Sequence, residues 1–367
     1  MKDNYKIGII GATGMVGQRF ITLLHNHPWY TIKVLAASSR SAGKKYRDAV
    51  GAKWSMAEEI PENVADMVVL DATADIEKIA SEVDFVFCAV DMKKDEIKAL
   101  EEAYAKAECP VVSNNSAHRH TPDVPMIIPE INPEHLDIIP AQRKRLGTKR
   151  GFVAVKSNCS LQSYLPAMAI INEKYPIDKS IVTTYQAISG AGKTFNTWPE
   201  MVDNLIPYIG GEEMKSEVEP NKILGKIEGG EIVPSNELQI ECQTYRVPVS
   251  DGHTAAIFFS FKDSANKPSV EEIEKMWKEF EGEPQKLNLP HAPKQFIHVY
   301  TENETPDQPQ IKTAREIDGG MAISCGRLRE STQFDYKMVS MSHNTLRGAA
   351  GGAVLLAELL TAKGWLD

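Results

Sequence analysis

The residues of this chain that could carry out covalent chemistry begin with a cysteine. Cys159 lies in the motif SNCS, after the strand-like run Phe152–Lys156 and before a segment with helical character. Backbone N–H groups at the start of a helix stabilise a thiolate over a thiol, and a thiolate attacks acyl carbons. The amide of Asn158 could hold the oxyanion that such an attack creates. Most cysteines are buried structural residues, but the position of Cys159 predicts a nucleophile.

A histidine and an arginine stand close together further along the chain, in the motif RVPVSDGH. His253 follows a glycine-containing turn, from which it could project into a cleft, and imidazole suits proton transfer near neutral pH. Arg246 offers a planar fork of donors that fits a substrate carboxylate. A histidine in a loop is more often a surface residue, so this prediction depends on the wider pattern.

A glycine-rich turn near the amino terminus predicts a dinucleotide site. It follows an apolar strand and precedes residues with helical spacing. Glycines let the backbone turn tightly and approach a pyrophosphate, which the free N–H groups of the helix start can bind. The residues that we expect to contact the cofactor here are Gly11, Thr13, Gly14, Met15, Val16 and Gly17.

The residues after the second strand indicate which dinucleotide is bound. An enzyme that uses NAD commonly carries an acidic residue there, for the ribose 2′-hydroxyl. This chain has Ser38, Ser39, Arg40 and Ser41 instead, followed by Lys44. Hydroxyls and cations without a carboxylate suit a 2′-phosphate, so we expect NADP.

Two further patterns resemble known sites but lack essential parts. Residues 189–194 look like the end of a phosphate-binding P-loop, but Ala187 occupies the position of its first glycine. His118 and His120 could begin a metal site, but no third ligand lies at a suitable spacing. We therefore predict neither a kinase or ATPase nor a metal centre.

The elements that must position these residues fall into two groups. The amino-terminal part alternates near-continuous apolar runs with amphipathic segments, which is typical of a doubly wound parallel sheet. Its predicted strands are Lys6–Ile10, Ile32–Ala37, Asp84–Val90 and Pro110–Ser113. Beyond Cys159, longer strands are expected at residues 181–188 and at Leu238–Val249 and His253–Phe261, the last two joined by a tight turn. They indicate a mixed, largely antiparallel sheet with helices on one face.

Two helices are expected late in the chain. Ser269 and Glu272 form a capping box that opens a helix lasting to about Phe280. The residues from Asn344 onward predict a terminal helix, whose leucines should pack on the first domain. Residues 301–310, rich in Asn, Pro and Asp, predict a surface loop.

Composition narrows the class of protein. The 367 residues suit two domains, and the net charge of −9 argues against a general nucleic-acid binder. No apolar run is long enough for a membrane span, and the first residues lead straight into a strand without room for a signal peptide. Five scattered cysteines indicate a reduced, cytoplasmic protein.

Together these motifs resemble the aspartate-semialdehyde dehydrogenase family, especially its archaeal and fungal branch. The resemblance runs almost from end to end, through GATGMVG, SSRSAGK, SNNSAHR, SNCS, QAISGAG, EEMKSEVEPNKIL, RVPVSDGH and NTLRGAAGG. It implies a Rossmann-type NADP-binding domain, residues 1–156 with 344–367, and an α+β catalytic and dimerisation domain, residues 157–343. It also implies a homodimer or homotetramer with a small-molecule substrate and no metal.

The resemblance also implies a role for each matching residue. Cys159 is similar to the family's acylated nucleophile, Gln186 to its substrate-orienting glutamine and His253 to its acid/base. Arg246 matches the arginine that binds the substrate α-carboxylate. Arg119 is implied at the substrate phosphate, and Glu212 and Lys215 at the substrate amine and phosphate, with Glu213 as an alternative to Glu212. Asn344 is implied near the nicotinamide. Asn158 is a further candidate for substrate binding, and Ser189 and Gly190 are further candidates for cofactor binding.

The implied reaction is the NADPH-dependent reductive dephosphorylation of L-aspartyl 4-phosphate to L-aspartate 4-semialdehyde. It belongs to the biosynthesis of lysine and diaminopimelate, threonine, methionine and isoleucine. Three alternatives share part of this pattern. A malonyl-CoA reductase would use the same cysteine and histidine on an acyl-CoA thioester, and an N-acetylglutamyl-phosphate reductase fits the flanking residues less well. A non-catalytic NADP-binding sensor would not require Cys159 or His253, and both are present.

Overall fold

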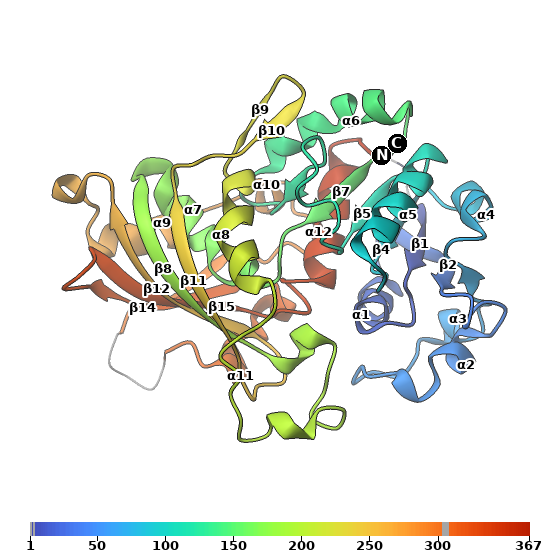
Figure 1. Cartoon of the computed structure of the whole chain (residues 1–367), viewed down its shortest axis with the longest axis horizontal. Helices are drawn as coiled ribbons and strands as arrows, with labels where there is room; N and C mark the ends of the chain where they lie inside the picture. Colours follow the sequence, from blue (N-terminus) through green and yellow to red (C-terminus); the bar gives the residue numbers. More distant parts are fainter. Residues whose placement is uncertain (1, 3, 303–307) are drawn as a thin grey trace.

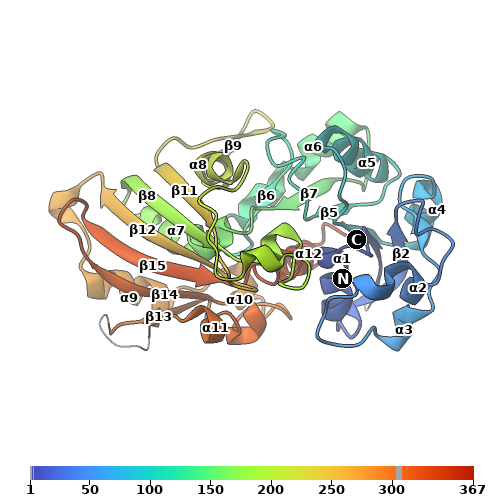
Figure 2. The same cartoon turned by 60° about the horizontal axis from the view of Figure 1, so that its bottom comes forward.

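The chain folds around two β-sheets that lie in separate lobes (Figure 1). This computed structural model describes residues 2, 4–302 and 308–367. Half of the loop expected at residues 301–310 therefore lies outside the described residues. The lobes stay side by side after the rotation shown in Figure 2, so the two sheets do not stack on each other.

The first sheet contains seven strands, all parallel, in the order β3-β2-β1-β4-β5-β7-β6. Its strands are β1 (Tyr5–Ile10), β2 (Tyr30–Ala37), β3 (Leu70–Asp71), β4 (Phe85–Cys88), β5 (Val111–Ser113), β6 (Met126–Ile127) and β7 (Val153–Lys156). Most of their side chains are buried on both faces, as their near-continuous apolar runs predict. The predicted doubly wound sheet is confirmed.

Helices cover both faces of this sheet. They are α1 (Met15–Leu24), α2 (Tyr46–Val50), α3 (Glu62–Ala65), α4 (Ile76–Glu82), α5 (Lys94–Lys106), α6 (Ile139–Leu146) and α12 (Ala350–Ala362). Leucines of α1 and α12 share one core with Phe87, whereas residues of α4 and α5 share the other with Val86. The terminal helix α12 thus packs against α1, β5 and β7, as its leucine-rich sequence predicts.

The second sheet is mixed and contains six strands in the order β11-β8-β12-β15-β14-β13. They are β8 (Ile177–Gln186), β11 (Gln239–Arg246), β12 (His253–Phe261), β13 (Ile297–Tyr300), β14 (Ile323–Glu330) and β15 (Tyr336–Ser342). The two outermost pairs are parallel and the three central pairs antiparallel. The predicted mixed, largely antiparallel sheet is confirmed.

The remaining elements pack around this second sheet. They are α7 (Leu165–Lys174), α8 (Glu212–Ile223), α9 (Val270–Glu279), α10 (Glu283–Lys286), α11 (Ile311–Ala314) and the small hairpin of β9 (Lys226–Glu228) and β10 (Glu231–Val233). The side chain of Ser269 accepts a hydrogen bond from the N–H of Glu272, so the predicted cap opens α9. Helix α8 contacts both β11 and β6 and lies between the two lobes in both views (Figures 1 and 2).

The connection between β11 and β12 differs from the sequence prediction. We expected a strand up to Val249 and a tight turn into the next strand, but β11 ends at Arg246. The two strands are not neighbours, because β8 lies between them, parallel to β11 and antiparallel to β12. The segment between Arg246 and His253 therefore crosses the end of β8, and this crossing matters for the site.

Candidate active site

A pocket of about 400 Å³ opens where the two lobes meet. It lies at the carboxyl ends of the parallel strands, where ligands bind in open α/β sheets. The predicted site residues that line it are Met15, Val16, Arg119, Asn158, Cys159, Ser189, Gly190, Glu212, Lys215 and Asn344. Residues proposed to bind the cofactor, to act as the nucleophile and to bind the substrate phosphate thus line one cavity.

Cys159 faces His253 inside this site, with 3.5 Å between Sγ and Nε2. The backbone N–H of Ala187 donates to Nδ1 of His253 over 3.1 Å, which places the imidazole proton on Nε2, toward the sulfur. Burial, and then the charge of Arg246, lower the pKa of His253 to about 3. The histidine is therefore neutral at ordinary pH and presents an N–H donor to the thiol.

The environment of Cys159 differs from the expected helix start. A short 3₁₀ turn, Leu161–Ser163, follows the cysteine, and α7 begins only at Leu165. Burial, and then the nearby carboxylate of Glu212, raise the pKa of the Cys159 thiol. The expected stabilisation of a thiolate by a helix N-terminus is wrong for this arrangement, so any stabilisation of the anion must come from side-chain cations and donors.

Strand register explains how three of the predicted residues come together. Gln186 is the last residue of β8, and it pairs with Arg246 on β11 and with His253 on β12. Arg246 also donates from Nη1 to the carbonyl of Ala187 over 2.6 Å. The side chains of Gln186, Arg246 and His253 therefore form one row across three strands.

Gly190 lies against this row, where any side chain would displace its neighbours. A Cβ at position 190 would lie 2.9 Å from Nη1 of Arg246 and 3.2 Å from Nε2 of His253. A contact of 3.2 Å is tighter than nine in ten real Cβ contacts, and one of 2.9 Å requires a neighbouring atom to shift. The close approach leaves Gly190 on the pocket wall beside the arginine and the histidine.

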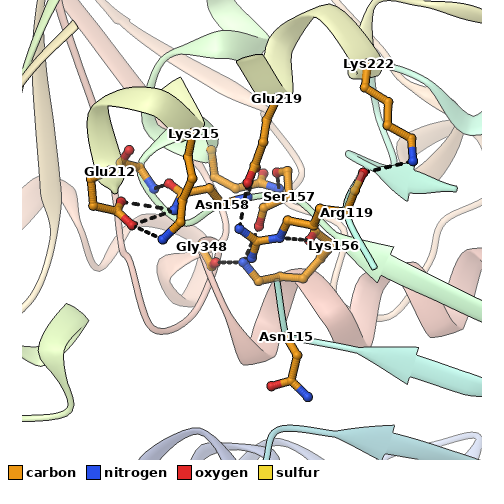
Figure 3. A network of polar contacts seen from close by, with 12 residues as sticks. Asn115, Arg119, Lys156, Ser157, Asn158, Glu212, Lys215, Glu219, Lys222 and Gly348 are labelled. Carbon is orange, nitrogen blue, oxygen red and sulfur yellow. Dashed lines mark hydrogen bonds and ion pairs between the residues drawn. The ribbon is translucent and has the colours of Figure 1, made fainter. Parts of the chain in front are cut away.

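Helix α8 presents a line of buried charges to the nucleophile loop (Figure 3). Glu212 accepts hydrogen bonds from Lys215 Nζ over 2.5 Å and from the Asn158 side chain over 3.0 Å. Burial favours the neutral form, but Lys215 and the hydrogen bonds outweigh it and lower the pKa of Glu212. Glu213 instead points to the N–H of Thr244 on β11. Of the two neighbouring glutamates, Glu212 is the one that lines the pocket.

Two further charges of α8 were missed from the sequence. Glu219 accepts a hydrogen bond from Arg119 Nη1 over 3.0 Å and another from the N–H of Asn158 over 2.9 Å. Lys222 donates to the carbonyls of Arg119, Thr121 and Val124. They could have been found from the spacing of charges, because residues three or four apart lie on one helix face. The pair therefore fixes the loop that carries Arg119.

Asn344 lies where the end of β15 leads toward α12. Its Oδ1 accepts a hydrogen bond from the N–H of Gly252 over 2.7 Å, and its Nδ2 donates to the hydroxyl of Ser189 over 2.9 Å. Ser189 and Asn344 both line the pocket on the side of Met15 and Val16. They are placed to contact a ligand that extends from the glycine turn toward Cys159.

The glycine turn has the geometry that a pyrophosphate needs. Gly11 adopts a φ of +91°, and a Cβ there would lie 2.3 Å from the carbonyl oxygen of Ala89. A Cβ on Gly17 would lie 2.2 Å from the carbonyl oxygen of Gly11. Helix α1 begins after Gly14 without a side-chain cap, so its first N–H groups remain available to a phosphate. Thr13 lies in the same turn.

The residues predicted to choose the cofactor lie at the carboxyl end of β2. Ser38, Ser39 and Arg40 are exposed, and Ser41 is partly buried just beyond them. Since β2 lies beside β1, this edge is next to the glycine turn. The Arg40 side chain is exposed at this edge, and no ion pair engages it within the part of the chain that the structure describes.

The one cluster of potential metal ligands within the described residues lies elsewhere. His27, His291 and Glu358 bring two imidazole nitrogens and a carboxylate oxygen within 4.8 Å of one another. The N–H of Trp29 donates to Nδ1 of His27, so the proton of this imidazole lies on Nε2 and points to Glu358 over 2.8 Å. A metal at that nitrogen would require the opposite tautomer, so hydrogen bonding accounts for the cluster. His118 and His120 have no part in it.

Two family models match the chain. "Semialdehyde dehydrogenase, NAD binding domain" matches residues 6–139, and "Semialdehyde dehydrogenase, dimerisation domain" matches residues 168–347. The chain is 44% identical to the aspartate-semialdehyde dehydrogenase of Candida albicans, over 98% of each chain. It is 41% identical to that of Methanothermobacter thermautotrophicus, over 96% of this chain and 98% of that one.

Solved structures show the same relationship. A crystal structure of the Candida albicans enzyme with NADP superposes with a TM-score of 0.87, at 42% identity over 99% of each chain. The aspartate semialdehyde dehydrogenase II of Vibrio cholerae shares the fold, with a TM-score of 0.72 at 23% identity over 98% of each chain.

Proposed function

The chain belongs to the aspartate-semialdehyde dehydrogenase family, and we propose that it reduces L-aspartyl 4-phosphate to L-aspartate 4-semialdehyde with NADPH. The observation that carries this proposal is the shared pocket, in which Cys159 lies 3.5 Å from His253 and beside Arg119 and Lys215. The reaction belongs to amino-acid biosynthesis, because the semialdehyde is a precursor of lysine, threonine and methionine.

Substrate binding follows from the charges around the nucleophile. The Arg246 fork suits the α-carboxylate, and Gln186, next to it in the row, suits the orientation of the acyl group. Glu212 offers a carboxylate to the substrate amine, while Arg119 and Lys215 offer cations to the phosphate. Both cations are paired with carboxylates of α8 in this structure. The substrate phosphate would therefore bind cations that these carboxylates already hold in position.

The chemistry then uses the sulfur and the imidazole. The thiolate of Cys159 forms a bond to the acyl carbon, the bond to the phosphate oxygen breaks, and inorganic phosphate leaves between Arg119 and Lys215. The Asn158 side chain, next to Cys159 in the chain, and Nε2–H of His253, 3.5 Å from the sulfur, are suited to donate to the developing oxyanion. In the last step the carbon–sulfur bond breaks, the aldehyde leaves, and His253 exchanges the protons that these steps require.

NADPH supplies the hydride that reduces the carbonyl carbon of the thioester. The turn of Gly11, Gly14 and Gly17 suits its pyrophosphate, and Ser189 and Asn344 suit its nicotinamide end. Arg40 suits the 2′-phosphate, in keeping with the NADP in the Candida albicans structure.

An acyl-CoA substrate, as in a malonyl-CoA reductase, is the second candidate on this scaffold. Malonyl-CoA has no α-amine, and its leaving group is a thiolate in place of a phosphate, although coenzyme A carries phosphates elsewhere. The carboxylate of Glu212 and the cations Arg119 and Lys215, which line the pocket with Cys159, would then have no amine and no leaving phosphate to bind, so the amino-acid phosphate is favoured.

We assign residues 1–156 with 344–367 to cofactor binding and residues 157–343 to catalysis and dimerisation. The second sheet has an exposed face on which apolar residues gather, among them Ile181, Tyr185 and Phe258. The segment before α8 exposes Val202, Leu205 and Tyr208. An exposed apolar surface of this kind marks an interface, so it supports a homodimer, and two dimers would form the tetramer.

We place the protein in the cytoplasm. Its five cysteines are free thiols, which agrees with a reducing compartment. No helix in the described part of the chain has the length and apolar character to cross a bilayer.

An absorbance assay tests this function. The purified protein is given L-aspartate 4-semialdehyde, NADP and phosphate, and the formation of NADPH is followed. We expect NADPH to form only when phosphate is present, and NAD to be a poor substitute. If this reaction is absent and the protein instead oxidises NADPH when malonyl-CoA is supplied, the enzyme is an acyl-CoA reductase.

Replacement of the nucleophile gives the first prediction. Cys159→Ser should lower kcat by about 10⁴-fold or more, because a serine hydroxyl lacks a comparable anion at neutral pH. Binding of NADP, measured by fluorescence titration, should stay close to that of the wild type. Near-normal turnover of this variant would contradict the thioester mechanism.

A further inference from the structure

A lysine that the mechanism above does not use lines the pocket of the nucleophile. Lys156 is the last residue of β7 and only 1% exposed, yet it lines the same pocket as Cys159. Lysine is almost never fully buried without a partner, because its ammonium loses hydration. The position therefore requires an explanation.

The hydrogen bonds of Lys156 connect the nucleophile loop to the segment before α12 (Figure 3). Its Nζ donates to the carbonyl of Ser157 and to the carbonyl of Gly348. Gly348 is itself pressed against the nucleophile, because a Cβ at this position would lie 2.9 Å from Cβ of Cys159. Lys156 thus holds two backbone segments that touch the cysteine.

Two carbonyls do not neutralise the charge of this ammonium. Among the described residues, the nearby carboxylates are already paired, Glu219 with Arg119 and Glu212 with Lys215, and none forms an ion pair with Lys156. The two carbonyls use two of the three Nζ donors, so one remains. A buried cation of this kind favours an anion nearby, and the reactive sulfur shares its pocket.

We propose that Lys156 is the cation that favours the thiolate form of Cys159, as a positioning residue behind the nucleophile loop. One proton passes from the thiol of Cys159 to the neutral amine of Lys156. The products are a thiolate and an ammonium, and the total number of protons on the two groups is unchanged. This inference rests on the proposed role of Cys159 as the nucleophile.

The electrostatic surroundings of both groups agree with this role. Burial, and then the charge of Arg119, lower the pKa of Lys156 to about 7, while Cys159 acts in the opposite direction. Burial and Glu212 raise the pKa of Cys159, and Lys156 is the first of the cations that lower it. The charged and titratable groups around the sulfur are Arg119, Lys156, Glu212, Lys215, Arg246 and His253.

The test is the pH dependence of Cys159 alkylation by iodoacetamide, because only the thiolate reacts. Lys156→Met keeps the length of the side chain and removes the charge. It should raise the midpoint of the alkylation profile by about one pH unit, which is about tenfold slower alkylation at neutral pH. Cys159→Ser gives the background from the other four thiols, all of which are buried.

Arg143→Met is the matched control. Arg143 is also a cation that donates to backbone carbonyls, those of Arg150 and Trp365, and burial lowers its pKa. It does not line the pocket of Cys159, so its removal should leave the midpoint at the wild-type value. Lys156→Arg, which keeps the charge, should restore most of the profile. A wild-type midpoint in Lys156→Met would overturn the proposal.

A reciprocal measurement serves if Lys156→Met does not fold. In protein labelled with ¹³C-lysine, Cys159→Ser should lower the pKa of Lys156, because the anion that stabilises the ammonium is absent. An unchanged titration of Lys156 would reject the coupling. Neither measurement uses substrate. If the alkylation midpoints are as expected but the protein does not oxidise the semialdehyde, only the proposed function is rejected.

Discussion

The two arginines proposed to bind substrate differ in their partners. Arg246 and Arg119 both carry guanidinium groups, but Arg119 is paired with Glu219, whereas Arg246 donates to a backbone carbonyl. No carboxylate among the described residues forms an ion pair with Arg246, and its Nη1 lies next to Gly190 on the pocket wall. Arg246 is therefore the arginine of the two that could bind a substrate carboxylate without giving up an ion pair.

Arg246→Leu should raise KM for the semialdehyde by about 10- to 100-fold, because a hydrogen-bonded pair with a charged group contributes about 1.5–3 kcal/mol. KM for phosphate should change little. Arg315→Leu is a suitable control, since Arg315 contacts Ser250 and Asp251 outside the pocket. An unchanged KM for the semialdehyde would place its carboxylate elsewhere.

Arg40→Ala should reduce the preference for NADP over NAD by about tenfold or more, because the 2′-phosphate loses a charged donor. The ratio of kcat/KM values for the two cofactors measures this. Arg47→Ala provides a control, since this basic side chain on α2 is paired with Asp66. If the preference survives Arg40→Ala intact, the phosphate is bound by other residues.

The residues that escaped the sequence prediction share one property. Lys156, Glu219 and Lys222 are charged but buried, and sequence patterns assign such residues to the surface. Cys159, His253 and Arg246 were proposed as site residues because their motifs place a reactive or charged group next to a turn. Glu219 and Lys222 had only the weaker signal of charges spaced along one helix face, and Lys156 had none, since the partners of all three come from distant segments.

At the scale of elements, the near-continuous apolar strands of the first sheet could be predicted well. Strand neighbours in the second sheet could not, because β11 and β12 are close in sequence yet separated by β8. Alternation of apolar and polar residues gives the faces of a strand but not its partner. The row of Gln186, Arg246 and His253 is a product of that register.

Gly190→Ala tests the row directly. The new Cβ would displace Arg246 or His253, so kcat/KM should fall by about tenfold to 100-fold, which is the scale for misplaced catalytic groups. The melting temperature should change little, because the pocket can accommodate a methyl group by moving the arginine. Full activity of the variant would show that the row tolerates a shift.

For the molecule as a whole, buried histidines predict a marked sensitivity to acid. Burial lowers the pKa of His27, His118 and His135. It also lowers the pKa of His343, to about 4. His253 shows the same effect. Below pH 6.5, the ordinary histidine value, the unfolded chain binds protons that the folded chain does not.

The free energy of unfolding should therefore be at its full value above pH 6.5 and decrease as pH falls toward 4. Each histidine contributes at most about 1.4 kcal/mol per pH unit in this window. Urea unfolding across this range measures the slope, and repetition at high salt separates it from the effect of net charge. A flat profile would mean that these imidazoles titrate normally in the folded protein.

The position of α12 affects how the protein folds while it is being synthesised. The strand β1 ends at Ile10, and the helix that covers it and α1 begins only at Ala350. A ribosome that adds about 5–20 residues per second needs roughly half a minute between the two. During that time α12 is absent from one face of the nascent parallel sheet, so the lobe of this sheet cannot complete its core before the lobe of the second sheet has been synthesised. Chaperones that shield apolar surface would meet this chain at that stage.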